Sequence, residues 1–444
     1  MSEILQIFHA ALAVVDPFRA VRENLALESG RLRAGEHIYH LDDFDRILVA
    51  GAGKAAAGMG RAVESILADR ISAGLLIVPK GARAPLRYIT CKQGGHPLPD
   101  EAGRRASGKV LELLAGADEK TLVLFLVSGG ASALLASPAP GVTLAEKNAV
   151  TSLLLGSGAA IGELNAVRKH LSAVKGGRLA AAAFPARLLT LIVSDVVGDR
   201  LDVIGSGPTV ADPSTFADAL RVVDRYDLGG RIPGRVRGFL DRGAAGLEEE
   251  TVKPGDPRLA RSAHLVVGNN RMALEAAREK AGRLGLAAEI APAAIEGEAR
   301  EAARILAAKA IQVQSGLHPG EKRCLLSGGE TTVRVLGKGR GGRNQELALA
   351  FSLEIAGREG VEMLSAGSDG VDGPTDAAGA VVDGSTVEQA TRAGLDAAAF
   401  LENNDSYTFF DELDRRAGTH GHLRTGASGT NVMDLQVLLV SRPL

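Results

Sequence analysis

The sequence predicts an α/β protein made of two Rossmann-like lobes, each built around a largely parallel sheet. With 444 residues, the chain exceeds the roughly 250–300 residues at which single hydrophobic cores stop growing. Short aliphatic runs alternate with stretches of helical periodicity, as in βαβ units. Glycine supplies 55 residues, about 12% of the chain against a usual ~7%, and several glycines directly follow the aliphatic runs.

The aliphatic runs define the expected strands in chain order. Strands of a parallel sheet are buried on both faces, and ligands bind beyond their carboxyl ends. A backbone that turns sharply there, with its N–H groups close to a ligand, needs residues without a Cβ atom. At any single loop, a tight turn without a ligand explains the glycine equally well. The expected strands cover residues 47–50, 75–78, 122–127, 188–193, 265–267, 324–326, 363–364 and 435–440.

The chain begins with a predicted amphipathic helix, because Ile4, Phe8, Leu12 and Val15 fall on one helical face. This segment lacks the basic region of a signal peptide. No uninterrupted apolar run approaches the ~18 residues that a membrane span needs. We therefore expect no membrane partner.

The composition of the chain predicts where the boundary between the two lobes lies. Residues 226–261 are rich in glycine, proline and charge and lack a long apolar run, which is typical of a connector. The expected domains are therefore residues 1–235 and 261–444, joined by a connector at 236–260.

Charge and cysteine content limit the classes of function. The formal net charge is -2, so there is no electrostatic reason to bind nucleic acid or anionic lipid. Only Cys91 and Cys324 are present, which disfavours a disulfide framework or a cysteine-based zinc site. This favours a reduced, cytoplasmic setting, and any anionic ligand must be held by local groups.

The first glycine turn of interest is GAGKA, residues 51–55, between a strand and a helix. It is not a Walker A sequence, and it is a weak dinucleotide fingerprint because Ala56 occupies the last glycine position. Lys54 would lie at a helix N-terminus, where backbone N–H groups and the helix dipole favour an anion. We take Lys54 as a candidate catalytic residue, with a solvated surface lysine as the alternative.

The second turn is LVSGGASALL, residues 126–135. Ser128, Gly129 and Gly130, with Ser132 at the helix entry, present consecutive N–H donors and two hydroxyls to a phosphate. In the preceding GGHPLPD, His96 is a weaker candidate acid or base, and Asp100 is better explained as a helix N-cap.

Two further stretches complete the first lobe. Residues 165–182 concentrate Arg168, Lys169, His170 and Lys175, which a solvated basic helix explains equally well. Asp195 follows a predicted buried strand beside another glycine turn at 205–209. Mg²⁺ prefers one or two carboxylates plus phosphate oxygens and water, so Asp195 is a candidate metal-linked catalytic carboxylate.

The second lobe repeats the tripeptide SGG at Ser327, Gly328 and Gly329, which we expect to form another phosphate-binding turn. The flanking residues differ from those around Ser128, which favours independent use of one turn over a duplication. Arg343 in a glycine-rich loop suits a two-pronged grip on a carboxylate or phosphate, and Asn344 begins the next helix. Asp369 is a second metal candidate, in a loop whose spacing does not fit an EF-hand.

Ten ordered blocks in this chain resemble the glycerate 2-kinases, the class II glycerate kinases with a C-terminal MOFRL domain. One departure is Ala427-Ser428, where members commonly carry Pro-Thr. The resemblance covers essentially the whole chain. The blocks are GAGKA (51–55), GGHPLPD (94–100), SGGASALL (128–135), NAVRKHLSAVKGGRLA (165–180), SDVVGD (194–199), GSGPT (205–209), SGGETTV (327–333), GGRNQE (341–346), SDGVDGPTDAAG (368–379) and TGASGTN (425–431).

The resemblance implies ATP- and Mg²⁺-dependent phosphorylation of D-glycerate at its 2-hydroxyl, giving 2-phosphoglycerate, in a cleft between the lobes. It leaves homo-oligomer formation open. Phosphoryl transfer depends mainly on positioning and charge neutralisation. We expect Lys54 and Arg343 to hold the carboxylate of glycerate and the transferring phosphoryl group, in either order.

Two other classes of function stay open at this point. An NAD(P)-dependent hydroxypyruvate reductase would use GAGKAA as its fingerprint, but Glu64 and Asp69 only straddle the expected acidic position. A non-catalytic sugar-phosphate sensor would keep the phosphate-binding turns and need no metal carboxylates. An assay with glycerate and ATP, against one with hydroxypyruvate and NADH, separates the two enzymes.

Overall fold

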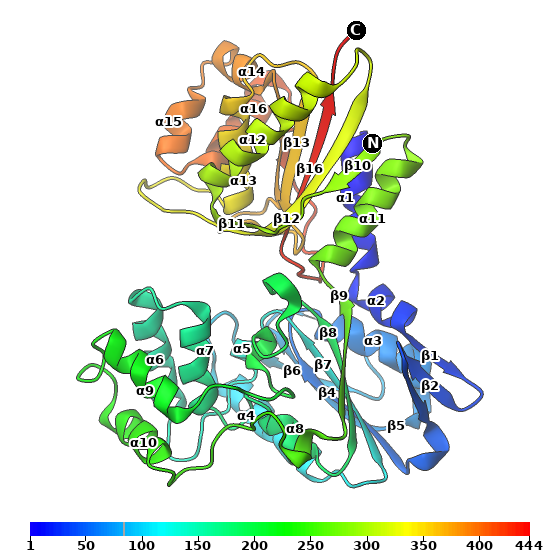
Figure 1. Cartoon of the computed structure of the whole chain (residues 1–444), viewed down its shortest axis with the longest axis vertical. Helices are drawn as coiled ribbons and strands as arrows, with labels where there is room; N and C mark the ends of the chain where they lie inside the picture. Colours follow the sequence, from blue (N-terminus) through cyan, green and yellow to red (C-terminus); the bar gives the residue numbers. More distant parts are fainter. Residues whose placement is uncertain (83–84) are drawn as a thin grey trace. The chain divides into compact units, whose positions relative to one another are not determined.

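The computed structural model describes residues 1–82 and 85–444 (Figure 1). The chain forms two compact units. Unit 1 contains residues 1–16 and 268–444, and unit 2 contains residues 17–267. The α/β class predicted from the sequence is confirmed, but this division differs from the expected domains at 1–235 and 261–444.

The difference arises because residues 236–260 do not form a connector. Helix α10 (Gly234–Ala244) buries Val236, Phe239 and Leu240, spaced at i, i+3 and i+4, in a helical core of unit 2. Strand β9 (Ser262–Gly268) then adds to the sheet of the same unit. The composition of this segment did not reveal the helix, because glycines and charged residues on the outer face of α10 outnumber the residues of its short apolar stripe.

Unit 2 is built on a six-stranded sheet in the order β6-β5-β4-β7-β8-β9. The pairs β5–β6, β4–β5, β4–β7 and β7–β8 are all parallel. Their carboxyl ends therefore share one edge. The strands are β4 (Arg46–Ala52), β5 (Ile71–Pro79), β6 (Thr90–Gly94), β7 (Thr121–Ser128), β8 (Arg187–Val193) and β9.

Helices cover both faces of this sheet. Helices α4 (Glu101–Ala115) and α8 (Arg178–Ala183) share a hydrophobic core with β4, β5, β7 and β8. Helix α3 (Ala56–Leu67) packs against strand positions of the opposite parity, as at Leu76, and thus lies on the other face. Asp100 caps α4 as predicted, since its carboxylate accepts the N–H of Gly103 at 2.8 Å.

A separate group of helices in unit 2 has its own core. Its members are α6 (Leu144–Gly156), α7 (Ile161–His170), α9 (Phe216–Arg225) and α10. The short helix α5 (Ala131–Leu134) follows β7. Unit 2 also contains α2 (Pro17–Asn24) and an antiparallel sheet that the sequence analysis did not predict, formed by β1 (Leu25–Glu28), β2 (Arg31–Ala34) and β3 (His37–His40).

Unit 1 has a mixed sheet in the order β10-β12-β16-β13-β14-β15, with β11 also paired to β12. The largely parallel sheet predicted for this lobe is therefore wrong in part. Strand β16, the last in the chain, lies between β12 and β13 and is antiparallel to both. The strands are β10 (Ala287–Ile290), β11 (Ile295–Glu298), β12 (Lys322–Thr332), β13 (Val361–Gly367), β14 (Gly379–Asp383), β15 (His422–Leu423) and β16 (Asp434–Ser441).

Helices also cover both faces of the mixed sheet. The N-terminal helix α1 (Glu3–Val14) buries Ile4 and Phe8, as its apolar face predicted, and packs with α11 (Asn270–Arg283) against β16. The main core of the unit lies on the other face. Its helices are α12 (Ala299–Gly316), α13 (Arg343–Glu354), α14 (Thr386–Arg392), α15 (Ala397–Glu402) and α16 (Ser406–Ala417).

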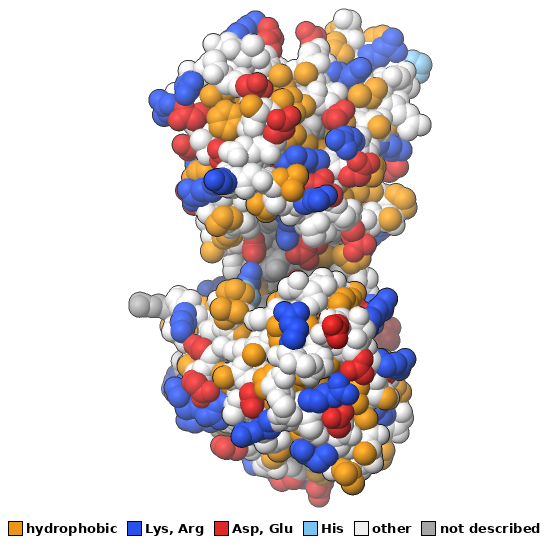
Figure 2. Space-filling view, turned by 90° about the vertical axis from the view of Figure 1, so that its left-hand side faces the viewer, with side chains coloured by type: hydrophobic (Ala, Val, Ile, Leu, Met, Phe, Trp, Pro, Cys, Tyr) orange, Lys and Arg blue, Asp and Glu red, His pale blue; other side chains and the backbone are white. Residues whose placement is uncertain are grey.

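All eight predicted strands are confirmed within longer observed strands. On the face shown in Figure 2, acidic and basic side chains are interspersed. Within the described residues, no single helix is long and apolar enough to cross a bilayer, and the bent pair α1 and α2 meets that test by length and composition only. Both cysteines are free.

Candidate functional site

Lys54 lies where predicted, in the turn between β4 and α3 at the carboxyl edge of the unit 2 sheet. The N–H of Lys54 donates to the carbonyl oxygen of Gly129 at 2.8 Å. The N–H of Ala55 donates to the Ser128 hydroxyl at 3.0 Å. These bonds fix the turn after β4 to the end of the neighbouring strand β7, so Lys54 and the first SGG turn form one site.

Glycine is required at two positions of this site. Gly53 has a φ of +143°, and a Cβ atom there would lie 2.1 Å from the Ser128 hydroxyl oxygen. Gly130 has a φ of +82°, and a Cβ atom there would lie 2.9 Å from the His96 ring and 3.4 Å from Lys54 Cγ. The His96 ring and the Lys54 side chain therefore flank Gly130.

Ser132, at the entry of α5, is part of a chain of polar contacts. Its hydroxyl lies 2.7 Å from the Ser206 hydroxyl, which donates to Asn165 Oδ1 at 3.2 Å. Lys175 Nζ donates to the Ser132 carbonyl oxygen at 2.8 Å. These bonds hold the 205–209 loop against the first SGG turn. Ser132 is half-buried.

Asp195 follows β8, the strand next to β7, as predicted. Ser128 pairs with Val193, so Asp195 comes two residues beyond the last pair and lies on the same edge of the sheet. Its side chain is half-buried. Asp202, further along, serves an ion pair, with Lys169 Nζ 3.5 Å from its carboxylate.

The basic stretch 165–182 is not a solvated helix, which corrects that alternative. Lys169 and His170 are buried, and each has a carboxylate partner. Lys169 Nζ lies 3.2 Å from Asp212 and His170 Nε2 lies 3.1 Å from Glu250. These two residues stabilise the packing of α7 and do not form a free basic surface.

In unit 1, Arg343 is the first residue of α13, and its guanidinium group is held by two carboxylates. Its Nε and Nη2 atoms donate to the two carboxylate oxygens of Asp434 at 2.6 and 3.0 Å, and Nη1 donates to Glu330 at 2.6 Å. Asp434 is 1% exposed, whereas the Arg343 side chain is 32% exposed. The sequence analysis missed Asp434, although it directly precedes the apolar run of β16.

Burial and charge act in opposite directions on this pair. Burial raises the pKa of Asp434 to about 6, even though Arg343 favours the ionised carboxylate. Burial lowers the pKa of Arg343, but Asp434 and Glu330 outweigh it and the net shift is upward. Arg343 therefore stays charged, and its orientation is fixed before any ligand binds.

Asn344 is buried and has a structural role in this state. Its N–H donates to Asp372 at 3.0 Å, and its side-chain oxygen accepts the Ser365 hydroxyl at 2.7 Å. Burial raises the pKa of Asp372. These bonds tie the start of α13 to the loop after β13.

Asp369, the second metal candidate, lies in that loop. Its side chain accepts the N–H of Val371 at 3.1 Å. A Cβ atom on Gly367 would lie 3.4 Å from Asp369 and 3.6 Å from Asp434, so both carboxylates flank this glycine. Within residues 1–82 and 85–444, no group of three or more His, Cys, Asp or Glu side chains could hold a metal ion.

The second SGG does not form the predicted turn. Ser327, Gly328 and Gly329 lie inside β12 and pair with Gln436, Leu435 and Asp434 of β16. A Cβ atom on Gly328 would lie 2.1 Å from the Asn270 side chain. Gly328 thus allows α11 to pack closely on the sheet, and Gly329 allows the close approach of Ile295 in β11. Because all three residues are paired as a strand, they form no phosphate-binding turn.

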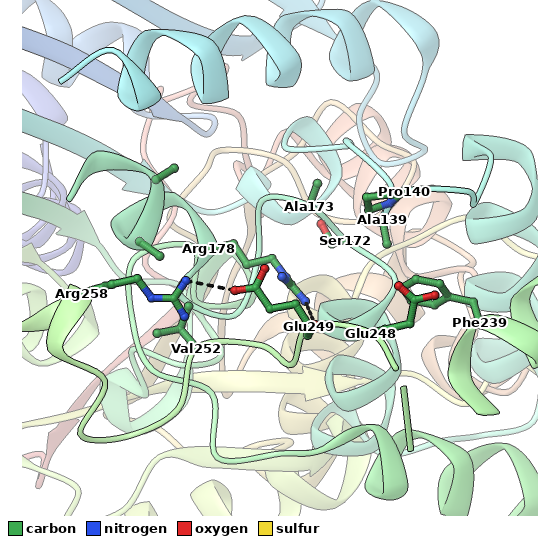
Figure 3. Close-up of a pocket in the computed structure, with 12 residues that line it drawn as sticks. Ala139, Pro140, Ser172, Ala173, Arg178, Phe239, Glu248, Glu249, Val252 and Arg258 are labelled. Carbon is green, nitrogen blue, oxygen red and sulfur yellow. Dashed lines mark hydrogen bonds and ion pairs between the residues drawn. The ribbon is translucent and has the colours of Figure 1, made fainter. Parts of the chain in front are cut away.

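Figure 3 shows a pocket of about 330 Å³ in unit 2 that contains none of the predicted site residues. Arg258 lies 3.0 Å from Glu249 and 2.8 Å from Asp256, and Arg178 donates to the carbonyl oxygen of Glu249 at 2.8 Å. Arg258 is thus ion-paired with two carboxylates of its own loop and Arg178 donates to the backbone there, so we do not assign a ligand to this pocket.

The two units define an α/β protein with a recognised domain pair. A family model described as a domain of unknown function, DUF4147, matches residues 3–241, and the MOFRL family model matches residues 323–434.

Similar proteins extend the comparison over the whole chain. A glycerate kinase of Danio rerio is 38% identical, over 98% of this chain and 96% of the relative. A D-glycerate 2-kinase of Thermotoga maritima is 39% identical, over 98% and 97%. A protein of Agrobacterium vitis provisionally named hydroxypyruvate reductase is 41% identical, over 98% and 93%. The crystal structure of the Thermotoga maritima glycerate kinase matches with a TM-score of 0.85, covering 99% of this chain and 98% of that one.

The chain belongs to the MOFRL-containing glycerate kinase family. The resemblance stated from the ten sequence blocks is therefore confirmed.

Proposed function

We propose that this protein transfers the γ-phosphoryl group of ATP to the 2-hydroxyl of D-glycerate, giving 2-phosphoglycerate and ADP. The relatives named above, matched over 98% of the chain, support this class of reaction. The observation that carries the proposal within the molecule is the fixed turn of Lys54 beside Ser128 and Gly129 at the carboxyl edge of a parallel sheet. This is the edge at which α/β proteins bind ligands.

The site residues have separate roles in this proposal. Backbone N–H groups of the Ser128–Gly130 turn would hold ATP phosphates, and Lys54 would neutralise charge on the transferring group. Arg343, preoriented by Asp434, would contribute a second cation. We propose no phosphate-binding role for the second SGG, residues 327–329. The cytoplasm, where two free thiols persist, is the proposed compartment.

Mg²⁺ fits the chemistry of the unit 2 edge. Asp195 supplies one half-buried carboxylate beside the proposed phosphate turn, and Mg²⁺ usually takes one or two carboxylates plus phosphate oxygens and water. Asp195 would hold the ion, with Asp369 as the weaker candidate. When bound, the ion would neutralise charge on the nucleotide phosphates.

The first test is the identity of the product. Incubation of the protein with D-glycerate and ATP, followed by enolase alone, should generate phosphoenolpyruvate, because only 2-phosphoglycerate is an enolase substrate. Phosphoenolpyruvate that forms only after phosphoglycerate mutase is added would contradict the proposed position of transfer. Oxidation of NADH with hydroxypyruvate, without turnover of ATP, would favour the reductase instead.

The structure bears on the reductase alternative through Glu64. Its carboxylate accepts the backbone N–H groups of Arg87, Tyr88 and Ile89 at 3.0, 2.6 and 2.8 Å. In a dinucleotide-binding fold, the ribose-binding carboxylate is expected at the end of the second strand of the parallel sheet. Glu64 lies instead on α3, and its carboxylate already accepts three backbone N–H groups. This observation favours the kinase.

A substitution tests the role of Asp195. We expect Asp195→Asn to lower kcat by about 10²–10⁴-fold, on the scale of losing one preorganised electrostatic contact, and to raise the Mg²⁺ concentration needed for half-maximal rate. The matched control is Asp241→Asn, which removes an exposed carboxylate of α10 paired with Arg237. A metal titration unchanged in Asp195→Asn would assign the ion elsewhere, first to Asp369.

A further inference from the structure

Three cations lie close together in unit 2, beside the first SGG turn. They are Lys147 on α6, Arg168 on α7 and Lys175 in the loop after α7. Lys147 is 4% exposed, Lys175 is 0% exposed and Arg168 is half-buried. Within the described part of the chain, no carboxylate forms an ion pair with any of them. Buried charges in proteins are normally paired, so this group lacks its counter-charge.

The neighbouring residues show that the missing partner is a local feature. Lys169 and His170 flank Arg168 on its C-terminal side in the sequence, and each is paired with a carboxylate. Carboxylates are therefore available around α7, but none in residues 1–82 and 85–444 forms an ion pair with Lys147, Arg168 or Lys175.

The hydrogen bonds of the two lysines to described residues are to neutral oxygens. Lys175 Nζ donates to the carbonyl oxygens of Ser132 and Gly205 at 2.8 and 3.4 Å, and Lys147 Nζ donates to that of Ser137 at 3.4 Å. Arg168 makes no side-chain hydrogen bond to another described residue, and none of its nitrogens is among the fully enclosed polar atoms. Its guanidinium group is therefore in contact with accessible space.

The electrostatics of the group agree with this geometry. Burial, and then the charge of Arg168, lower the pKa of Lys147 to about 7. Burial, Lys147 and Arg168 together lower the pKa of Lys175. An anion placed among these side chains would favour their protonated, charged forms.

The group belongs to the same edge of the sheet as the Lys54 site. Lys175 contacts Ser132, which directly follows the Ser128–Gly130 turn. Asn148, next to Lys147 on α6, donates to the carbonyl oxygen of Pro99 at 3.2 Å, in the loop that carries His96. An anion at Arg168 would therefore bind close to the residues proposed to hold the phosphates.

We propose that Arg168, supported by Lys147, binds the carboxylate of the acceptor substrate. This inference rests on the proposed function, since a carboxylate-bearing acceptor is what that function requires. A guanidinium fork matches a carboxylate with two parallel hydrogen bonds. The assignment leaves Lys54 to the phosphoryl group, and it selects 2-hydroxy carboxylates over polyols that lack a carboxylate.

The test compares two KM values in one variant. We expect Arg168→Gln to raise the KM for D-glycerate about 10- to 100-fold, the range for losing a charge-assisted hydrogen bond, and to leave the KM for ATP within about twofold. Arg168→Lys keeps the charge, loses the fork and should give an intermediate KM. The matched control is Arg221→Gln, which removes an exposed arginine of the neighbouring helix α9.

A binding measurement makes the result independent of catalysis. D-Glycerate should raise the Tm of the wild-type protein, and this increase should be lost in Arg168→Gln and kept in Arg221→Gln. Glycerol, which has the hydroxyls without the carboxylate, should raise neither Tm at the same concentration. Without ligand, Arg168→Gln should be at least as stable as wild type, because the substitution removes a half-buried charge that forms no ion pair with a described carboxylate.

Each other outcome overturns the inference in an identifiable way. A rise in the KM for ATP alone would assign Arg168 to the nucleotide phosphates. Unchanged KM values, or a Tm increase with D-glycerate that survives in Arg168→Gln, would mean that Arg168 binds no substrate. If wild type binds D-glycerate but does not phosphorylate it, the proposed function fails while the binding comparison still decides the role of Arg168.

Discussion

At the scale of single residues, the pair of Arg343 and Asp434 joins the start of α13 to the start of β16 in unit 1. A guanidinium group with one buried and one half-exposed carboxylate is held in a single orientation, and 32% of its side chain remains exposed for a ligand. The partner carboxylate is costly to ionise in its buried position, as its raised pKa shows. The buried Asp434 carboxylate thus lowers the stability of the folded protein, and in return it holds Arg343 in one orientation.

This cost predicts a pH dependence. Because the pKa of Asp434 is about 6 in the folded protein and about 3.9 in an unfolded chain, the folded state binds more protons between these values. The contribution of Asp434 to stability should therefore fall as pH rises from about 4 to about 6. Relative to Asp434→Asn, wild type should lose on the order of 1–3 kcal/mol of unfolding free energy over that range.

Urea unfolding at several pH values measures this difference. Asp411→Asn serves as the control, because Asp411 is 51% exposed and its ion pair is with the exposed Arg424. A constant stability difference between wild type and Asp434→Asn from pH 4 to pH 6 would show that burial does not dominate the titration of Asp434.

At the scale of elements, the turn from β4 into α3 is built against the end of β7. Two hydrogen bonds from backbone N–H groups join them, and Gly53 allows the approach because a Cβ atom would meet the Ser128 hydroxyl at 2.1 Å. The backbone oxygen and nitrogen of Ser128 would lie 2.8 and 2.9 Å from the same atom. Moving the Ser128 side chain away would therefore not relieve the contact.

We expect Gly53→Ala to separate the two turns. The positive φ and the backbone contacts should cost about 1–3 kcal/mol of stability, and phosphorylation of D-glycerate should fall because Lys54 moves with the turn. Gly108→Ala is the matched control in the same unit. Gly108 lies within α4 with open space around its Cβ position, so alanine should stabilise the helix by about 0.5–1 kcal/mol.

Thermal unfolding and kcat/KM, measured on both variants, separate the effects. A Gly53→Ala protein with normal stability and normal turnover would show that the close approach of the two turns is not needed for either.

At the scale of the whole molecule, the proposed function assigns one cation to each unit. Lys54 belongs to unit 2 and Arg343 to unit 1. We propose that both act on the same phosphoryl transfer. Replacing Arg343 by alanine would leave Asp434 buried without its partner, which costs about 3–5 kcal/mol. Arg343→Lys keeps a charge and removes the fork, so it suits the test better.

We expect Lys54→Ala to lower kcat/KM by about 10²–10⁴-fold and Arg343→Lys by about 10–10³-fold, as for charge-assisted contacts to the transition state. The double variant should lose less than the product of the two effects, because residues that act on one transition state are not additive. Steady-state kinetics on the four proteins give the coupling.

The control cycle pairs Lys54→Ala with Lys338→Ala, an exposed lysine of unit 1, and its effects should multiply. If the effects on kcat/KM also multiply when Lys54→Ala is combined with Arg343→Lys, then Arg343 and Lys54 serve different steps.

The sequence by itself determined the α/β class, the eight strand positions, the amphipathic first helix and the family. These depend on local patterns: aliphatic runs for buried strands, a helical face for Ile4 and Phe8, and glycines after strands. Lys54 and Ser128 each follow a predicted strand, and parallel strands bring their following turns to one edge. Each of these features can be recognised from a short segment.

Only the tertiary structure decided the features that depend on residues far apart in the sequence. The tripeptide SGG at 327–329 has the same local sequence as the turn at 128–130, but β16 pairs with it over its full length and keeps it extended. Residues 1–16 belong with residues 268–444 because the apolar face of α1 is covered by α11. Asp434 orients Arg343, and among the residues that the structure describes no carboxylate forms an ion pair with Arg168. Pairing and burial of this kind depend on which segments meet in the fold, and no local pattern records that.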